Sequence, residues 1–167
     1  MTTYRIAAAT KRAATALALG ATFALAACGS EAETVASAPE GVIEGVTIEN
    51  ARMVLAPVQG NPAAVYFDFS YNGDRAFSLG RVSVEGTQSA MMHQFGEYDF
   101  KVQMMEALPI PVTNGTKVEF KPGDYHVMAF EVSPDLKPGD TTEVTLTVSG
   151  GDKHKFTADI RAAGEER

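Results

Sequence analysis

Apolar and polar residues alternate over short stretches from residue 42 to residue 160. A period of two is typical of β-strands that bury one face. The run Ala64–Tyr71 shows it best, and turn signals such as Asn72-Gly73 and Pro122-Gly123-Asp124 separate the stretches. Strands are predicted at residues 46–55, 64–71, 77–84, 89–95, 102–108, 117–120, 125–132, 141–149 and 155–160.

About nine short strands at this spacing predict an all-β domain, either a β-sandwich or a Greek-key barrel. No sustained helical period follows residue 41, and the sequence shows no internal repeat and no second domain. We therefore expect one compact β-domain over residues 42–162, followed by a polar tail at 163–167.

The N-terminal segment has a different pattern. Three basic residues precede an apolar stretch at 13–24, which ends in Leu25-Ala26-Ala27-Cys28. This pattern predicts a signal peptide at residues 1–27 that ends in a lipobox, with Cys28 lipidated. The alternative is an ordinary cleavage site with small residues that happens to contain Cys. Resemblance to Gram-negative lipoproteins, with Gly29 after the Cys, favours the outer membrane.

Residues 28–41 comprise Cys28 and a stretch rich in Ala, Glu, Ser and Pro, which predicts a flexible tether. Removal of the leader takes away three of the 14 basic residues and none of the 21 acidic ones, so the mature chain carries a net charge of −10. Such a charge repels nucleic acid. With the only Cys used for lipid, disulfides and thiol redox chemistry are excluded.

Methionine and histidine are concentrated between residues 91 and 128. Five of the seven methionines and two of the three histidines lie there. Thioethers and imidazoles are neutral donors that suit soft metal ions. The stretch therefore predicts a soft-metal site within the β-domain.

Strand geometry indicates which of these side chains meet. His126 and Met128 are two residues apart, so they share a face of their strand. His93 and Met104 lie on strands that a turn at Gly96 to Asp99 would join, and antiparallel pairing can place them side by side. Four neutral donors favour Cu(I), whose single charge is cheaper to desolvate than that of a divalent ion. The predicted ligands are His93, Met104, His126 and Met128.

Neighbouring residues are candidates for supporting roles. Each ligand His needs a hydrogen-bond partner for its second ring nitrogen, and Glu97, Asp99 and Asp124 are close in sequence. The remaining methionines of the stretch are either auxiliary donors or packing residues. They are Met91, Met92 and Met105.

The residues resemble those of the periplasmic Cu(A) chaperone family, PCu(A)C. His93, ten residues, Met104, 21 residues, His126, one residue and Met128 match that family's motif spacing. Lys121-Pro-Gly-Asp-Tyr-His126-Val-Met128 is similar to its Pro-Gly-Gly-x-His-x-Met run, and the resemblance covers residues 46–148. It implies a cupredoxin-like β-barrel that binds Cu(I) through the four residues.

The resemblance also implies a role without catalytic turnover. A copper chaperone outside the cytoplasm would deliver copper toward the Cu(A) centre of cytochrome c oxidase or buffer periplasmic copper. Expected partners are an oxidase subunit or an assembly factor, and the membrane through the lipid anchor, with the domain itself monomeric. The sequence departs from the family pattern at Asp124, where Gly is usual, and at Met105-Glu106-Ala107, where Arg-Pro-Val is common.

Three other classes of protein compete with this interpretation. A metal-free lipoprotein acting as an interaction or adhesion module requires only the β-domain. A blue-copper electron carrier requires a Cys thiolate beside two His, which the mature domain lacks. A hydrolase requires a nucleophile or a hydrolytic zinc site, and two His near Met form neither. The chain is therefore not expected to be an enzyme.

Overall fold

The computed structural model of the chain describes residues 41–165, and every regular element within them is a β-strand. None of these residues forms an apolar helix of membrane-spanning length. The predicted leader, Cys28 and most of the tether lie outside the described residues. The strands are β1 (Val46–Val54), β2 (Ala63–Tyr71), β3 (Phe77–Val84), β4 (Thr87–Tyr98), β5 (Lys101–Glu106), β6 (Ile110–Val112), β7 (Lys117–Phe120), β8 (His126–Val132), β9 (Thr141–Val148) and β10 (Lys153–Arg161).

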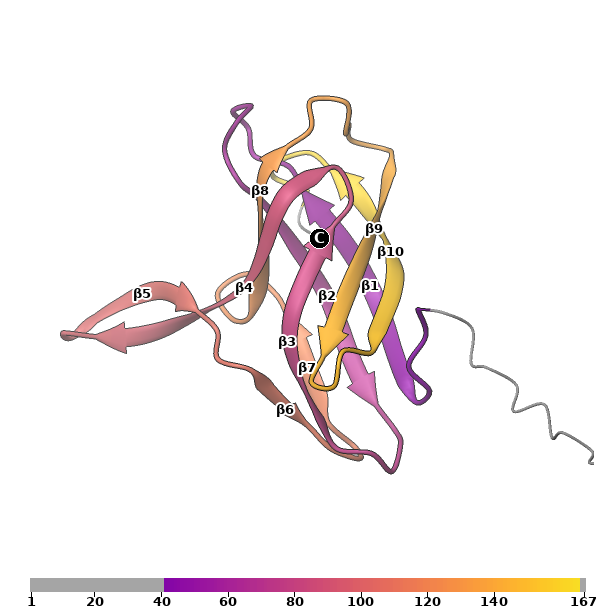
Figure 1. The fold of residues 1–167 in the computed structure, drawn as a ribbon. Coiled ribbons are helices and arrows are strands. Elements are labelled where there is room, and N and C mark those ends of the chain that lie inside the picture. The colour runs from indigo at the N-terminus through magenta and orange to yellow at the C-terminus, as the bar shows by residue number, and fades with distance from the viewer. Residues whose placement is uncertain (1–40, 166–167) are drawn as a thin grey trace, which may run out of the picture. The chain divides into compact units, whose positions relative to one another are not determined.

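The strands form one continuous ladder in the order β5-β4-β8-β2-β1-β10-β9-β3-β6, with β7 also paired to β2. All pairs are antiparallel except β1 with β10. The sheet is rolled up, so that β3 and β9 pass across the face of β2 (Figure 1). The prediction of an all-β domain is confirmed.

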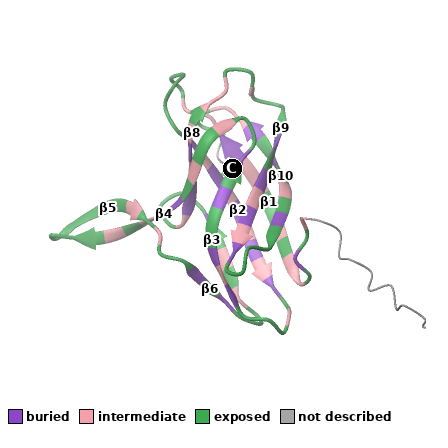
Figure 2. Ribbon diagram, in the orientation of Figure 1, coloured by how far each residue is buried: buried purple, intermediate pink, exposed green. Residues whose placement is uncertain are grey.

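The core lies inside this rolled sheet, and β2 shows why it forms. Its residues alternate between buried and half-buried along all nine positions, as a strand with one core face must (Figure 2). Phe67 stacks on Phe120 of β7 with ring centroids 4.2 Å apart, and it also contacts Phe156 of β10. Side chains from both halves of the sheet therefore join in one apolar cluster.

One strand was not predicted. The ladder ends at β6, a three-residue edge strand that pairs with β3. Its centre is Pro111, which cannot donate a backbone hydrogen bond and so occurs only at sheet edges. Three residues with a central proline show too little alternation to indicate a strand.

The turn between β4 and β5 was predicted at Gly96 to Asp99, and this placement was wrong. β4 runs on to Tyr98, which pairs with Lys101, so the turn consists of Asp99 and Phe100 alone. Both have positive φ, 51° and 58°, as a two-residue type I′ turn requires. The resulting hairpin, residues 93–106, projects from the body of the domain (Figure 1).

Candidate metal centre

Three neighbouring strands bring the predicted ligands to one face of the sheet. His93 of β4 lies opposite His126 of β8, and Met91 lies opposite Met128 on the same two strands. On the other side of β4, Met104 of β5 pairs with Phe95. Since residues two apart share a face, all these side chains project from the same side of the sheet.

His126 is held by a hydrogen bond that fixes its orientation. Its side chain is 4% exposed, and its Nδ1 lies 2.7 Å from the backbone carbonyl oxygen of Asp124. A carbonyl only accepts, so Nδ1–H donates and Nε2 carries a free lone pair. Nε2 lies 3.0 Å from the Sδ atom of Met104. Two soft-metal donors thus converge on one point although they lie 22 positions apart in the sequence.

His93 completes the pair of imidazoles. Its ring centroid lies 6.0 Å from that of His126, and its Nδ1 is buried without a hydrogen-bond partner among the described residues. Burial lowers the pKa of His93, the nearby His126 lowers it further, and Glu106 opposes both. The ring is therefore neutral near pH 7, the form in which imidazole binds metals.

The two thioethers have different surroundings. Met104 is 46% exposed on the projecting hairpin, while Met128 is half-buried between Met91 on β4 and Ala64 on β2. Met128 lies on the same face as His126, next to the two imidazoles. The structure therefore brings Met104 into contact with His126, places His93 directly opposite His126, and places Met128 two residues from His126 on the same face.

The other methionines separate by strand face. Met91 projects from the ligand face, where it is 39% exposed. Met92 points the opposite way and lies in the apolar core. Met105 is also on the opposite face, where its side chain packs over Gly96. Met91 alone of these three is placed to assist the four predicted ligands.

The residues that support the two candidate ligand histidines differ from those expected. Asp124 does support His126, but through its backbone carbonyl and not its carboxylate. Glu97 pairs with Val102 farther along the hairpin, and Asp99 lies in its turn. The carboxylate beside the site is that of Glu106, directly opposite His93. Only the strand register reveals it, so no sequence spacing could have identified it.

The rim of the site is aromatic. Phe95 lies 5.5 Å from His126 between ring centroids, and Phe130 lies 6.3 Å from His93. No group of three His, Cys, Asp or Glu side chains gathers for a metal in residues 41–165. The candidate donors on this face are imidazoles and thioethers, with two aromatic rings and the Glu106 carboxylate beside them, and such neutral donors favour a soft cation of low charge.

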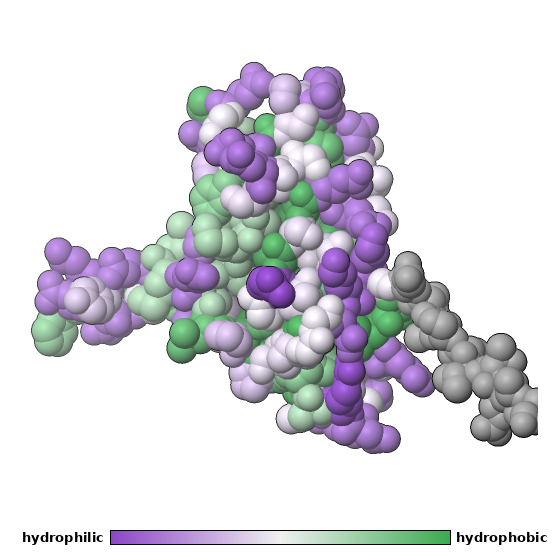
Figure 3. Space-filling model, viewed as in Figure 1, coloured by the Kyte–Doolittle hydropathy of each residue, from purple (hydrophilic) through white to green (hydrophobic). Residues whose placement is uncertain are grey.

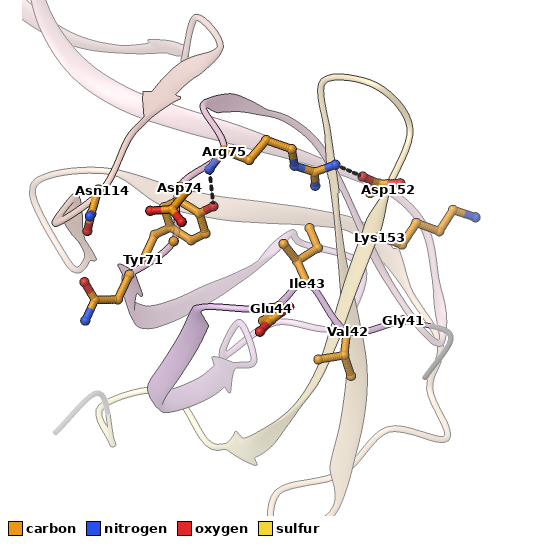
Figure 4. A pocket seen from close by; sticks show the side chains of 12 residues that line it. Gly41, Val42, Ile43, Glu44, Tyr71, Asp74, Arg75, Asn114, Asp152 and Lys153 are labelled. Carbon is orange, nitrogen blue, oxygen red and sulfur yellow. Dashed lines mark hydrogen bonds and ion pairs between the residues drawn. The ribbon is translucent and has the colours of Figure 1, made fainter. Parts of the chain in front are cut away.

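A separate hollow lies near the start of the described chain (Figure 4). Its volume is about 740 Å³, and none of the predicted ligands lines it. Asp152 forms an ion pair of 2.6 Å with Arg75, whose backbone N–H donates to the Tyr71 hydroxyl. These three residues line the hollow and contact one another, through the ion pair between Arg75 and Asp152 and the hydrogen bond between Arg75 and Tyr71.

The rolled all-β domain has the fold of the PCuAC domains. It is similar to the copper-bound PCuAC domain from PmoF2, with a TM-score of 0.57 and 21% identity over 75% of this chain and 99% of that one. It is also similar to the apo PCuAC domain from PmoF1, with a TM-score of 0.58 and 24% identity over 71% and 94% of the two chains. It is similar, too, to the solution structure of CuI-DR1885 from Deinococcus radiodurans, with a TM-score of 0.55 and 20% identity over 75% of this chain and 84% of that one.

The sequence model of the LpqE-like lipoproteins matches residues 46–160, and the chain belongs to this family. Membership and fold together confirm the resemblance to the PCu(A)C proteins. A search of curated proteins found no match.

Proposed function

We propose that the protein is a lipid-anchored, extracytoplasmic copper chaperone that binds one Cu(I) through His93, Met104, His126 and Met128. One observation carries the proposal. The free lone pair of His126 Nε2 and the Met104 sulfur face each other at 3.0 Å, while the other ring nitrogen is bonded to a carbonyl. An outer hydrogen bond that aims an imidazole in this way is usual for metal-binding histidines.

The donor set suits a protein that carries copper and releases it. Two imidazoles and two thioethers add no charge, so bound Cu(I) retains about one positive charge, which the Glu106 carboxylate opposite His93 can balance. No thiolate is present to make the site a permanent store. The half-exposed Met104 keeps one side of the site open to a partner.

We assign Met91 an auxiliary role in this transfer. It lies opposite Met128 and two residues from His93 on the ligand face. A third thioether there gives copper an alternative donor when a partner displaces one of the four ligands. Met92 and Met105, on the other face, have no such role.

The destination of the copper is proposed from the relatives. Solved PCuAC domains include a copper-bound form and a Cu(I) form, and the family is one of lipoproteins. We propose delivery to a copper-accepting protein at the membrane, with the Cu(A) subunit of cytochrome c oxidase or its assembly factor as the first candidate, and buffering of copper as the second. Attachment to the outer membrane stays a prediction.

A metal-free interaction module remains the alternative, because the projecting hairpin exposes several apolar side chains. Competition with a colorimetric Cu(I) chelator separates the two functions. A chaperone binds one Cu(I) per chain, and Met104→Ala lowers the affinity about tenfold or more, on the order of 1.4 kcal/mol. Met105→Ala is the matched control, since it removes a thioether from the opposite face of the same strand. Absence of Cu(I) binding by the wild-type chain would establish the module instead.

A further inference from the structure

Exposed apolar side chains gather on one part of the domain. Among the described residues, nine large hydrophobic side chains are exposed, and seven of them lie between residues 91 and 108. Figure 3 shows an apolar end on the projecting hairpin, beyond a polar stretch. Three of the seven lie in or next to the turn of the hairpin: Tyr98, Phe100 and Val102, at 70%, 93% and 75% exposure. We call these three residues the hairpin tip.

The backbone of the hairpin tip is unusual. Phe100 adopts a φ of 58°, in a region that bulky residues rarely occupy. A type I′ turn favours Asn-Gly, and the chain has Asp99-Phe100 there. A strained, almost fully exposed aromatic residue at the outermost point of the fold gains nothing from the core. Its apolar surface therefore suits contact with something outside the domain.

We propose that the hairpin tip inserts into the interfacial layer of the membrane that carries the lipid anchor. This inference rests on the anchored state in the proposed function, and not on copper binding. Aromatic rings with a nearby Lys are typical of side chains at the bilayer interface, and Lys101 pairs directly with Tyr98.

The length of the tether favours a bilayer as the occupant. Twelve residues separate Cys28 from Gly41. Fully extended they reach about 40 Å, so the domain cannot leave the neighbourhood of the membrane. A tether of this length gives an effective concentration in the millimolar range, and a weak insertion then suffices.

The size of the tip also favours a bilayer over a protein. An aromatic side chain buries roughly 150–250 Å², so two aromatic rings and one valine fall well short of the 1,200–2,000 Å² of a stable protein interface. A convex tip of this kind can insert between lipid headgroups without a complementary pocket. The acidic Glu97 and Asp99 beside it indicate zwitterionic lipid as the preferred surface.

Insertion at this point has a consequence for the copper site. The start of the described chain and the projecting hairpin lie on opposite sides of the domain (Figure 1). Attachment at both would hold the domain along the bilayer, with the ligand face at a fixed height above it. A copper acceptor in the same membrane would then meet the site in one orientation.

The chain contains no Trp, so a single Trp reports on its own surroundings. We would prepare the full-length, lipidated chain with Phe100→Trp and reconstitute it in phosphatidylcholine vesicles with ordinary or brominated acyl chains. Val58→Trp, in the loop between β1 and β2, is the matched control, since Val58 is also exposed. Insertion predicts blue-shifted emission and quenching by brominated lipid for Phe100→Trp, and neither for Val58→Trp.

Equal emission of Phe100→Trp in brominated and ordinary vesicles would overturn the proposal. A blue shift that grows with protein concentration, without bromine quenching, would also overturn it and assign the tip to a second copy of the chain. A Cu(I) titration of the Phe100→Trp protein tests the copper site separately. Failure of insertion therefore leaves the proposed function intact, and failure of copper binding leaves the insertion result readable.

Discussion

At the scale of single residues, adjacent methionines have opposite fates because a strand alternates its faces. Met91 reaches the ligand face while Met92 is 6% exposed in the core. The same alternation gives His126 and Met128 a common face with buried Val127 between them. Whether a methionine here can bind metal or packs in the core therefore depends on its position in the strand and not on its residue type.

This separation predicts opposite effects for two Met→Ala substitutions. Met92→Ala removes a buried side chain and should lower the free energy of unfolding of the apo protein by about 2–5 kcal/mol, with Cu(I) affinity unchanged. Met128→Ala should weaken Cu(I) binding about tenfold or more, with a smaller effect on stability. Urea denaturation and chelator competition on both variants measure these quantities. Loss of copper affinity in Met92→Ala alone would contradict the assignment.

Much of the site could be predicted at this scale. The pairing of His126 with Met128 follows from their spacing, and the meeting of His93 with the β5 strand follows from antiparallel pairing. The positions of Glu106 and of the Asp124 carbonyl could not be predicted. Both depend on register and backbone direction, which emerge only when three strands are aligned.

At the scale of elements, the β4–β5 hairpin brings the candidate ligand Met104 to His126, with 3.0 Å between the Met104 sulfur and His126 Nε2. Met104 lies on β5, the edge strand at this end of the ladder, whose one neighbour in the described sheet is β4. The sequence indicated both strands but not the turn, because Asp99-Phe100 lacks the Asn-Gly composition of a type I′ turn. The strand simply continues through Gly96, a residue that suggested a turn.

Relief of backbone strain in this turn should stabilise the hairpin. Phe100→Gly removes a Cβ from a positive-φ position, which is worth on the order of 1 kcal/mol. Amide protons of the hairpin should then exchange with solvent about fivefold more slowly. Hydrogen-exchange NMR on Gln103 and Gly96, which pair in the hairpin, measures this, with β9 amides as the internal control. Faster exchange would show that the Phe100 side chain itself holds the turn.

A second element-scale contact links β10 to the start of the described chain. The backbone N–H of Ile43 donates to Nδ1 of His154 at 3.1 Å, and Lys155 N–H donates to the Gly41 carbonyl at 2.7 Å. Burial lowers the pKa of His154 below its usual 6.5. A neutral ring is needed, because a proton on Nδ1 would remove the acceptor.

The sign of the pH dependence follows from this shift. His154 of the unfolded chain takes up a proton near its ordinary pKa of 6.5, whereas His154 of the folded chain takes one up only at lower pH. Between these two pKa values the unfolded state binds more protons, so the free energy of unfolding falls as the pH falls from 6.5 toward the folded-state pKa. His93 contributes in the same direction. Urea midpoints between pH 7.5 and 5.5 should therefore drop less for His154→Gln than for wild type. Equal drops in both proteins would contradict a role for His154.

At the scale of the whole molecule, the apolar core and the candidate metal site lie on opposite faces of the rolled sheet. The Phe67 stack and its neighbours fill the inside of the roll, while the candidate donors project from the other face of the sheet near the β5 edge. The fold class could be predicted because alternation and turn signals recur along the chain. The ladder order could not, since β1 pairs with β10 across more than 100 residues.

X-ray absorption at the copper edge tests the central claim most directly. Loaded with one Cu(I), the wild-type chain should show two nitrogen and two sulfur neighbours around the metal, and Met104→Ala should lose one sulfur while Met105→Ala keeps both. A copper environment without sulfur in the wild-type protein, or an unchanged environment in Met104→Ala, would contradict the account.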